Sequence, residues 1–242
     1  MSYVTGQPIP GDINVGVDSP EVIYPKDGFV VNVNVGSGQM RGPDGTGYIP
    51  WKKDGWIPVD KEVCIPEGLK IDVLNGGLVR HFGEDSVDAI YTSATLEHFV
   101  VEETQEVMAQ FHTILRPGGA LRISVPDIDV ICRQFLDGDR EWWCNNDLSG
   151  RAPGTELEDW EIVHCFLAGI GVNRASRTVR VGHVARGHHY SAYNQVVLRR
   201  MLTMAGFADG ALQFCAFGKT KFEIFADMDR RGACSIHVEA QK

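Results

Sequence analysis

Two residue patterns in the first quarter of the chain have the types and spacing of a nucleoside site. Gly36, Ser37 and Gly38 directly follow a β-branched run, and glycine there permits a positive φ and a close backbone approach to a ligand. Asp60 lies 22 positions after Gly38, close to the spacing of about 20 residues at which a carboxylate accepts ribose hydrogen bonds. The alternative interpretation is a tight turn and a strand-end aspartate in solvent.

Histidine supplies the candidate proton chemistry, because an imidazole titrates near pH 7 and can take the proton of a hydroxyl during group transfer. The candidates are one isolated histidine and a later cluster beside two tyrosines: His98, and His183, His188 and His189 with Tyr190 and Tyr193. We expect the catalytic group to be His98, His188 or His189. For each histidine the alternative is a structural or exposed group.

A metal site is the other chemistry that histidines suggest. Imidazoles near Asp127 or Asp129 in space would be ligands for a divalent ion, but the spacing matches no H-E-x-x-H or comparable signature. Glu97 and His98 are neighbours, and neighbouring side chains on a helix diverge by about 100°, so we expect them not to face one atom. The sequence therefore predicts no metal.

Strands and helices alternate along the part of the chain that carries these residues. A first strand is predicted from residue 28. Further strands, rich in β-branched or apolar residues, are predicted at 56–60, 70–75, 87–93 and 120–127, with two closing strands in 211–217 and 233–242. Apolar residues at helical spacing predict helices in 96–115, ended by RPGG, and in 194–207. This order predicts a doubly wound α/β fold, with ligands beyond the carboxyl ends of its parallel strands.

Two segments do not fit the alternation. Residues 1–27 are rich in Pro, Gly and Asp and predict an N-terminal arm before a single domain of residues 28–242. Residues 128–188 predict a cap over the acceptor site. The aromatic and basic residues of this cap would contact a sugar or an anionic acceptor. Alternatively, the tryptophans pack on the core and the arginines face solvent. These residues are Trp142, Trp143, Trp160, Arg174, Arg177, Arg180 and Arg186.

Composition excludes several classes of protein. The 242 residues are 43% hydrophobic and 23% charged, as in a folded domain. The net charge of −9 repels phosphate backbones, so we expect no nucleic-acid partner. The amino-terminal residues lack a basic and apolar leader, and apolar runs are short, so we expect a cytoplasmic protein without membrane contact. The six cysteines form no C-x-x-C pair, and we expect reduced thiols.

Six fragments in order, DGFVVNVNVGSGQ, GWIPVD, EDSVDAIYTSATLEHF, ILRPGGALRISVPD, AGF and CSIHVEAQK, resemble class I S-adenosylmethionine-dependent methyltransferases, in particular predicted ones from polysaccharide and surface-glycan gene clusters. The resemblance covers roughly residues 28–242 and is weakest across 39–54 and 132–182. It implies a mostly parallel seven-stranded Rossmann-like sheet whose last strand is antiparallel. It also implies S-adenosylmethionine as the cofactor.

The resemblance further implies where the cofactor lies. Besides the glycine turn and Asp60, it places cofactor contacts at two turns and one loop: Asn34, Asn75, Gly76, Ser93, Ala94, Leu96 and Glu97. Asn34 and Asn75 replace the acidic residues common in the family, and the chain between the glycine turn and the second strand is longer than usual. The missing charge predicts a weaker affinity for the cofactor.

The acceptor and two rival functions stay open. A small-molecule or glycan hydroxyl is the favoured acceptor, by association with the related gene clusters. One rival is a non-catalytic, nucleoside-binding scaffold of the same fold. The other is a nucleotide-sugar dehydrogenase or epimerase, which needs Tyr and Lys four apart on a helix; Tyr48 and Lys52 have this spacing, but Pro50 lies between them. The sequence does not indicate an oligomeric state.

Overall fold

The computed structural model describes residues 30–37, 39–41, 48–50, 55–61, 68–139, 142, 172–173, 178–179, 189–229, 232 and 234–242. The expected arm at 1–27 and most of the expected cap at 128–188 lie outside these described residues. Both therefore stay predictions.

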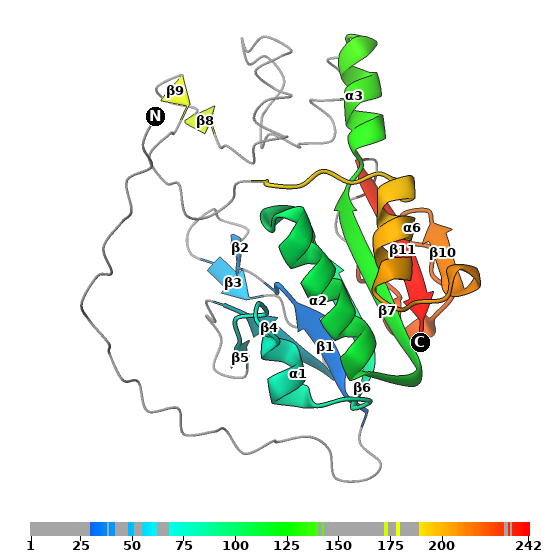
Figure 1. Cartoon of the computed structure of the whole chain (residues 1–242). Helices are drawn as coiled ribbons and strands as arrows, with labels where there is room; N and C mark the ends of the chain where they lie inside the picture. The colour runs from blue at the N-terminus through cyan, green and yellow to red at the C-terminus, as the bar shows by residue number, and fades with distance from the viewer. Residues whose placement is uncertain are drawn as a thin grey trace, which may run out of the picture.

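A seven-stranded sheet forms the centre of the described structure, with the order β10-β11-β7-β6-β1-β4-β5 (Figure 1). Its strands are β1 (Asn32–Val35), β4 (Trp56–Asp60), β5 (Leu69–Lys70), β6 (Val87–Ser93), β7 (Leu115–Pro126), β10 (Leu212–Cys215) and β11 (Ser235–Gln241). The five strands from β5 to β7 are parallel, whereas β11 runs antiparallel to both β7 and β10. The predicted mostly parallel, seven-stranded sheet with an antiparallel last strand is confirmed.

The central strands are buried on both faces, which explains their nearly continuous apolar sequences. In β1, Val33 and Val35 belong to the main core. In β6, Ile90 packs into that core, whereas Tyr91 joins a smaller cluster with Trp56. The predicted strands at 56–60 and 87–93 have the observed bounds because apolar runs of this length end at polar turns.

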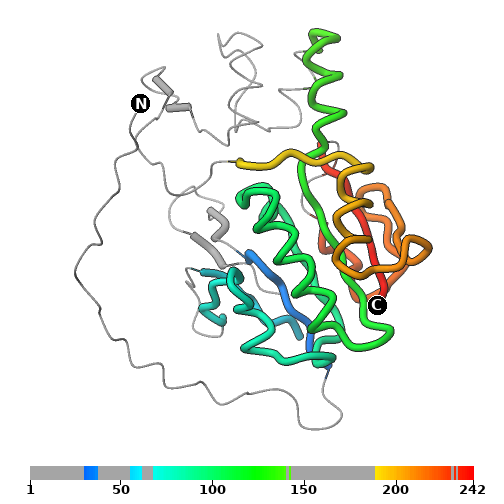
Figure 2. Tube along the Cα trace, in the orientation of Figure 1, coloured from blue at the N-terminus to red at the C-terminus, as the bar shows by residue number. Residues whose placement is uncertain are grey.

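Among the described residues, helices cover one face of the sheet (Figure 2). They are α1 (Gly77–Phe82), α2 (Val101–Ile114) and α6 (Gln195–Met204). Their buried side chains, including Phe82, Phe111 and Leu202, complete the main core. At the start of α6 the Asn194 side chain accepts a hydrogen bond from Val197 N at 2.9 Å. The helix ends before Gly206, whose φ is 113°. It therefore lies within the range 194–207 that the sequence predicted.

The other face is covered, among the described residues, by the segment around the 3-10 helix η3 (Glu223–Phe225). Phe225 and Met228 pack there against Trp56 and Tyr91. The Tyr91 hydroxyl donates a 2.9 Å hydrogen bond to the Met228 carbonyl. This segment thus packs against β4 and β6 on that side.

Several predicted bounds differ from the structure. β5 spans only two residues and overlaps the strand predicted at 70–75 at Lys70 alone, because the chain turns through Asn75 and Gly76, with φ of 55° and 74°. The helix predicted from residue 96 starts at Val101, since residues 96–98 form the 3-10 helix η1 (Leu96–His98) and Phe99 is extended. β7 starts at Leu115, so RPGG lies within the strand, where the register with β6 shifts.

Smaller strand pairs lie outside the main sheet. β2 (Gln39–Arg41) and β3 (Tyr48–Pro50) form a hairpin in the stretch after the glycine turn. Tyr48 therefore begins a strand instead of a helix, while Lys52 lies outside the described residues. β8 (Val172–Asn173) pairs with β9 (Thr178–Val179).

A helix among the described residues falls within the range of the expected cap. α3 (Ile128–Leu136) continues from the carboxyl end of β7 (Figure 1). The Asp127 side chain caps α3 by accepting from Asp129 N at 3.0 Å and Val130 N at 3.5 Å. Within the described residues, no helix is both long and apolar enough to cross a membrane, and Cys132, Cys215 and Cys234 are free thiols.

Candidate functional site

The carboxyl ends of the central strands bring the predicted cofactor residues to one edge. Gly36 N and Ser37 N donate to the Val59 carbonyl at 2.8 and 3.1 Å, so the glycine turn lies against the end of β4. Val35 pairs with Thr92 of β6 on its other side. The turn, Asp60 and the loop after β6 therefore share this edge, as predicted, while Gly38 lies outside the described residues.

Gly36 is required by the fold itself. Its φ is 69°, and a Cβ at this position would lie 2.1 Å from Thr95 Oγ1. Thr95 Oγ1 in turn lies 3.1 Å from the Ser93 carbonyl and 3.4 Å from the Gly36 carbonyl. The sequence predicted that the lack of a Cβ at Gly36 lets a ligand approach closely. In the structure it also lets the loop after β6 approach through Thr95, a residue that the sequence analysis did not single out.

Asp60 and the Asn75–Gly76 turn flank the glycine turn. Asp60 is partly exposed at the end of β4, and its carbonyl accepts from Ile71 N at 3.0 Å. The Asn75 side chain is exposed, and its carbonyl accepts from the Arg80 guanidinium. Gly76 N donates to Glu106 Oε1 at 2.9 Å. The turn therefore has a structural role in starting α1, and Asn75 keeps an exposed amide.

The loop after β6 is held in an unusual backbone conformation. Ala94 has a φ of 51°, and its N–H donates to the Ser124 carbonyl at 2.9 Å. Left-handed non-glycine residues of this kind concentrate at functional sites. Ser93 and Ala94 remain partly exposed, whereas the Leu96 side chain is fully buried in the core and offers no free surface to a cofactor.

Glu97, His98 and His189 form a cluster at this edge. One ligand atom from each residue lies within 4.8 Å of the others. The His98 and His189 rings meet edge to face, with centroids 5.0 Å apart and planes at 65°. The expectation that Glu97 and His98 would not face one atom is wrong, because the long side chains of neighbouring residues can converge at their tips in the short turn of η1.

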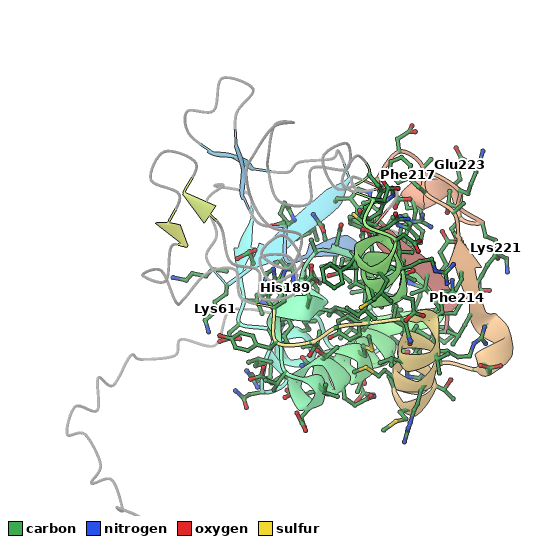
Figure 3. The ribbon with its side chains drawn as sticks, turned by 90° about the horizontal axis from the view of Figure 1, so that it is seen from above. Lys61, His189, Phe214, Phe217, Lys221 and Glu223 are labelled. Atoms are coloured by element: carbon green, nitrogen blue, oxygen red, sulfur yellow. The ribbon has the colours of Figure 1, made fainter. Side chains whose placement is uncertain are left out.

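Hydrogen bonds to backbone carbonyls hold the two halves of the cluster together. Tyr190 N and Ser191 N donate to the Glu97 carbonyl at 2.7 and 3.2 Å, and Ser191 Oγ donates to the Phe99 carbonyl at 2.6 Å. In the view from above, His189 lies near the middle of the molecule (Figure 3). The segment before α6 is thereby tied to the loop after β6.

Tyr193 anchors the same contact from inside the core. Its hydroxyl donates to the Leu96 carbonyl at 3.0 Å and lies 2.8 Å from Thr104 Oγ1. Burial raises the pKa of Tyr193, and the nearby Glu97 carboxylate adds to the rise, so this phenol stays neutral and structural. The exposed Tyr190 and the buried Tyr193 thus have different environments.

Other predicted residues are separated from the cluster. Asn34 is buried within β1 at 4% exposure. Asp127 caps α3 instead of joining the histidines, and burial raises its pKa despite the hydrogen bonds from Asp129 and Val130. The remaining candidates lie outside the described residues: His183, His188, Trp143, Trp160, Arg174, Arg177, Arg180 and Arg186.

A family model described as "Methyltransferase domain" matches residues 57–123. The matched segment begins in β4, ends in β7 and includes Asp60, the Asn75 turn, Glu97 and His98. Together with the sheet order, this match supports a methyltransferase of class I type, with S-adenosylmethionine as its cofactor. A search of curated proteins gave no significant match.

Solved methyltransferase structures resemble the chain at low identity. A SAM-dependent methyltransferase from Archaeoglobus fulgidus is 13% identical, with 89% of this chain and 87% of that chain covered and a TM-score of 0.47. The Burkholderia thailandensis 1,6-didemethyltoxoflavin-N1-methyltransferase, with bound S-adenosylhomocysteine, is 17% identical (88% and 70% covered, TM-score 0.41). An O-methyltransferase family protein from the same organism is 13% identical (88% and 51% covered, TM-score 0.43), so the chain spans about half of its length.

Proposed function

We propose that the chain transfers the methyl group of S-adenosylmethionine to a hydroxyl of a small molecule or glycan. The observation that carries the proposal is the position of the His98–His189 pair. The pair lies at the strand edge where Gly36, Asp60 and Ser93 gather. A methyl donor held by that edge would have two imidazoles beside its acceptor.

The cofactor contacts follow from the exposed groups of this edge. Asp60 accepts hydrogen bonds from the ribose hydroxyls, as its place at the end of β4 allows. Ser37 and Gly36 border the methionine part, and the exposed Asn75 amide, next to Gly76, borders the adenine. Ser93, Ala94 and the backbone around Leu96 and Glu97 lie beside the sulfonium.

Methyl transfer needs alignment and the removal of one proton. The acceptor oxygen attacks the methyl carbon in line with the carbon–sulfur bond, and the bonding pair leaves with sulfur as S-adenosylhomocysteine. A hydroxyl keeps its proton at pH 7, so help with proton loss speeds the reaction, by roughly 10²- to 10⁴-fold when a side chain supplies it. His98 and His189 assist this loss, and His188 is a further candidate. An amine acceptor would need less help, which favours O-methylation.

The experiment measures binding and transfer separately. Calorimetric titration with S-adenosylmethionine gives the affinity, and transfer of a labelled methyl group to a panel of glycosides and phenols gives the rate. His98→Ala and His189→Ala should lower the rate and leave cofactor affinity nearly unchanged, whereas the control His81→Ala on α1 should change neither. If both site variants methylate as fast as the wild-type chain, the assignment of the pair is wrong.

A non-catalytic scaffold is the second candidate function, because Asn34 and Asn75 lack charge and Asn75 belongs to a structural turn. The same titration, repeated with NAD, distinguishes the candidates. If the chain binds neither ligand, the scaffold is favoured and the methyltransferase is contradicted; if it prefers NAD, a dehydrogenase is favoured.

In the proposed function residues 128–188 form a cap over the acceptor, the chain works in the cytoplasm, and no nucleic acid or membrane takes part.

A further inference from the structure

We propose that Glu97, His98 and His189 bind a divalent transition-metal ion. The sequence spacing predicted no metal, because the second histidine comes from a distant segment. The binding site stands on its own geometry, whereas its role in methyl transfer rests on the proposed function.

The distances suit one shared ion. Nitrogen and oxygen ligands lie about 2.0–2.2 Å from metals such as zinc, so two ligands of one ion are about 3–4 Å apart. The ligand atoms of the cluster already lie within 4.8 Å of one another. Side-chain rotations that move the ligand atoms by about an ångström would therefore complete the coordination.

The surrounding bonds preorganise the site. Tyr190 N and Ser191 N both donate to the Glu97 carbonyl, and Ser191 Oγ donates to the Phe99 carbonyl. These contacts fix the two backbone segments that carry the ligands.

The three residues of the cluster differ in burial. The Glu97 residue is 1% exposed. His98 and His189 are only partly buried. The cluster therefore has a closed side at Glu97 and an open side, where further ligands of the ion can enter.

The donor types select the metal. Imidazole nitrogen suits zinc, iron, nickel and copper, and a carboxylate adds manganese, whereas magnesium and calcium prefer oxygen ligands alone. Two imidazoles and one carboxylate thus favour Zn²⁺, Mn²⁺ or Fe²⁺ over Mg²⁺. Three protein ligands leave coordination positions for an acceptor hydroxyl.

Coordination would define how the pair assists methyl transfer. A hydroxyl bound to a divalent ion has a lowered pKa, so it releases its proton to water near neutral pH. The oxygen then forms its bond to the methyl carbon while the carbon–sulfur bond breaks and the electron pair stays on sulfur. His98 and His189 act as ligands in this scheme, and the acceptor class becomes a hydroxyl able to coordinate the ion.

The test uses the full, tag-free chain in equilibrium dialysis against Zn²⁺, Mn²⁺ or Mg²⁺, followed by elemental analysis. We expect about one equivalent of Zn²⁺ or Mn²⁺ and much weaker binding of Mg²⁺. His189→Ala and Glu97→Gln should weaken binding by more than the roughly 10- to 100-fold typical of outer-shell changes. His81→Ala, which removes a partly buried imidazole elsewhere, is the matched control and should bind as the wild-type chain does.

A second readout separates lost ligands from lost folding. Co²⁺ bound by the wild-type chain should show visible absorption that His189→Ala loses, while circular dichroism shows that the variant is folded. Binding of no ion by the wild-type chain, or equal binding by folded His189→Ala and His81→Ala, overturns the proposal. Methyl transfer that continues in the presence of chelators would refute the role of the ion in transfer and leave the methyltransferase standing. Metal binding without any transfer would support the site and contradict the proposed function.

Discussion

The ring of His98 meets the ring of His189 edge to face, with centroids 5.0 Å apart, although the two residues lie in segments far apart in the chain. The hydrogen bonds from Tyr190 N and Ser191 N to the Glu97 carbonyl create this contact. It joins the loop after β6 to the segment that leads into α6. The candidate site thus depends on the docking of α6 beside α2 as much as on the residues themselves.

Asp60→Ala should weaken the binding of S-adenosylmethionine by about 1–3 kcal/mol, because the carboxylate is assigned to charge-assisted hydrogen bonds with the ribose. Calorimetric titration measures the change. Asp209→Ala, at an exposed aspartate that pairs with Arg199, is the control and should bind the cofactor normally. Unchanged affinity in Asp60→Ala would remove the ribose assignment.

Gly36→Ala should destabilise the chain more than Gly55→Ala does. Both glycines have a positive φ, 69° and 78°, but a Cβ at Gly36 would meet Thr95 at 2.1 Å, whereas nothing lies within 4 Å at Gly55. Gly55→Ala therefore reports the backbone cost alone, about 1 kcal/mol. Urea unfolding compares the two variants, and equal losses would mean that Thr95 does not constrain the turn.

Arg122→Ala should lower the free energy of unfolding by about 3–5 kcal/mol, because it leaves buried carboxylates without their partner. The guanidinium is 1% exposed and lies 2.5 Å from both Asp229 and Glu239. Burial alone would lower the pKa of Arg122, but these carboxylates outweigh it and raise the pKa. Arg199→Ala, at the exposed pair with Asp209, should cost less than about 1 kcal/mol; a similar loss in both would contradict the role of burial.

The stability of the chain should fall in acid partly through Asp229. Burial would raise the pKa of Asp229, yet the neighbouring His237 and Arg122 lower it below its usual value. A carboxyl whose folded pKa is lowered adds stability that is complete above its unfolded pKa of about 3.9. This stability is lost as the pH falls below that value toward the folded pKa.

Urea unfolding of the wild-type chain and Asp229→Asn between pH 7 and pH 2.5 measures this contribution. Asp229→Asn should be less stable at pH 7, and the gap between the two chains should narrow below about pH 4. A gap that stays constant down to pH 2.5 would show that Asp229 does not titrate with a lowered pKa in the folded chain.

Sequence alone determined the elements that depend on neighbouring residues. The strands at 56–60 and 87–93 and the helix before Gly206 follow from apolar runs, helical spacing and turn residues, which act over only a few positions. The same local logic placed the glycine turn, Asp60 and the loop at 93–98 at the carboxyl ends of strands. It also misplaced the start of β7 and the length of β5, because pairing with β6 and the left-handed turn at Asn75 override local preference.

Tertiary structure decided which of these residues meet. Thr95 fills the space beside Gly36, Arg122 lies between Asp229 and Glu239, and His189 joins His98 and Glu97. Each contact joins segments far apart in the chain, so it depends on the order of the strands and on how α6 packs against α2. No spacing along the sequence encodes such a distance, because it is produced by the burial of the shared core and by hydrogen bonds between loops.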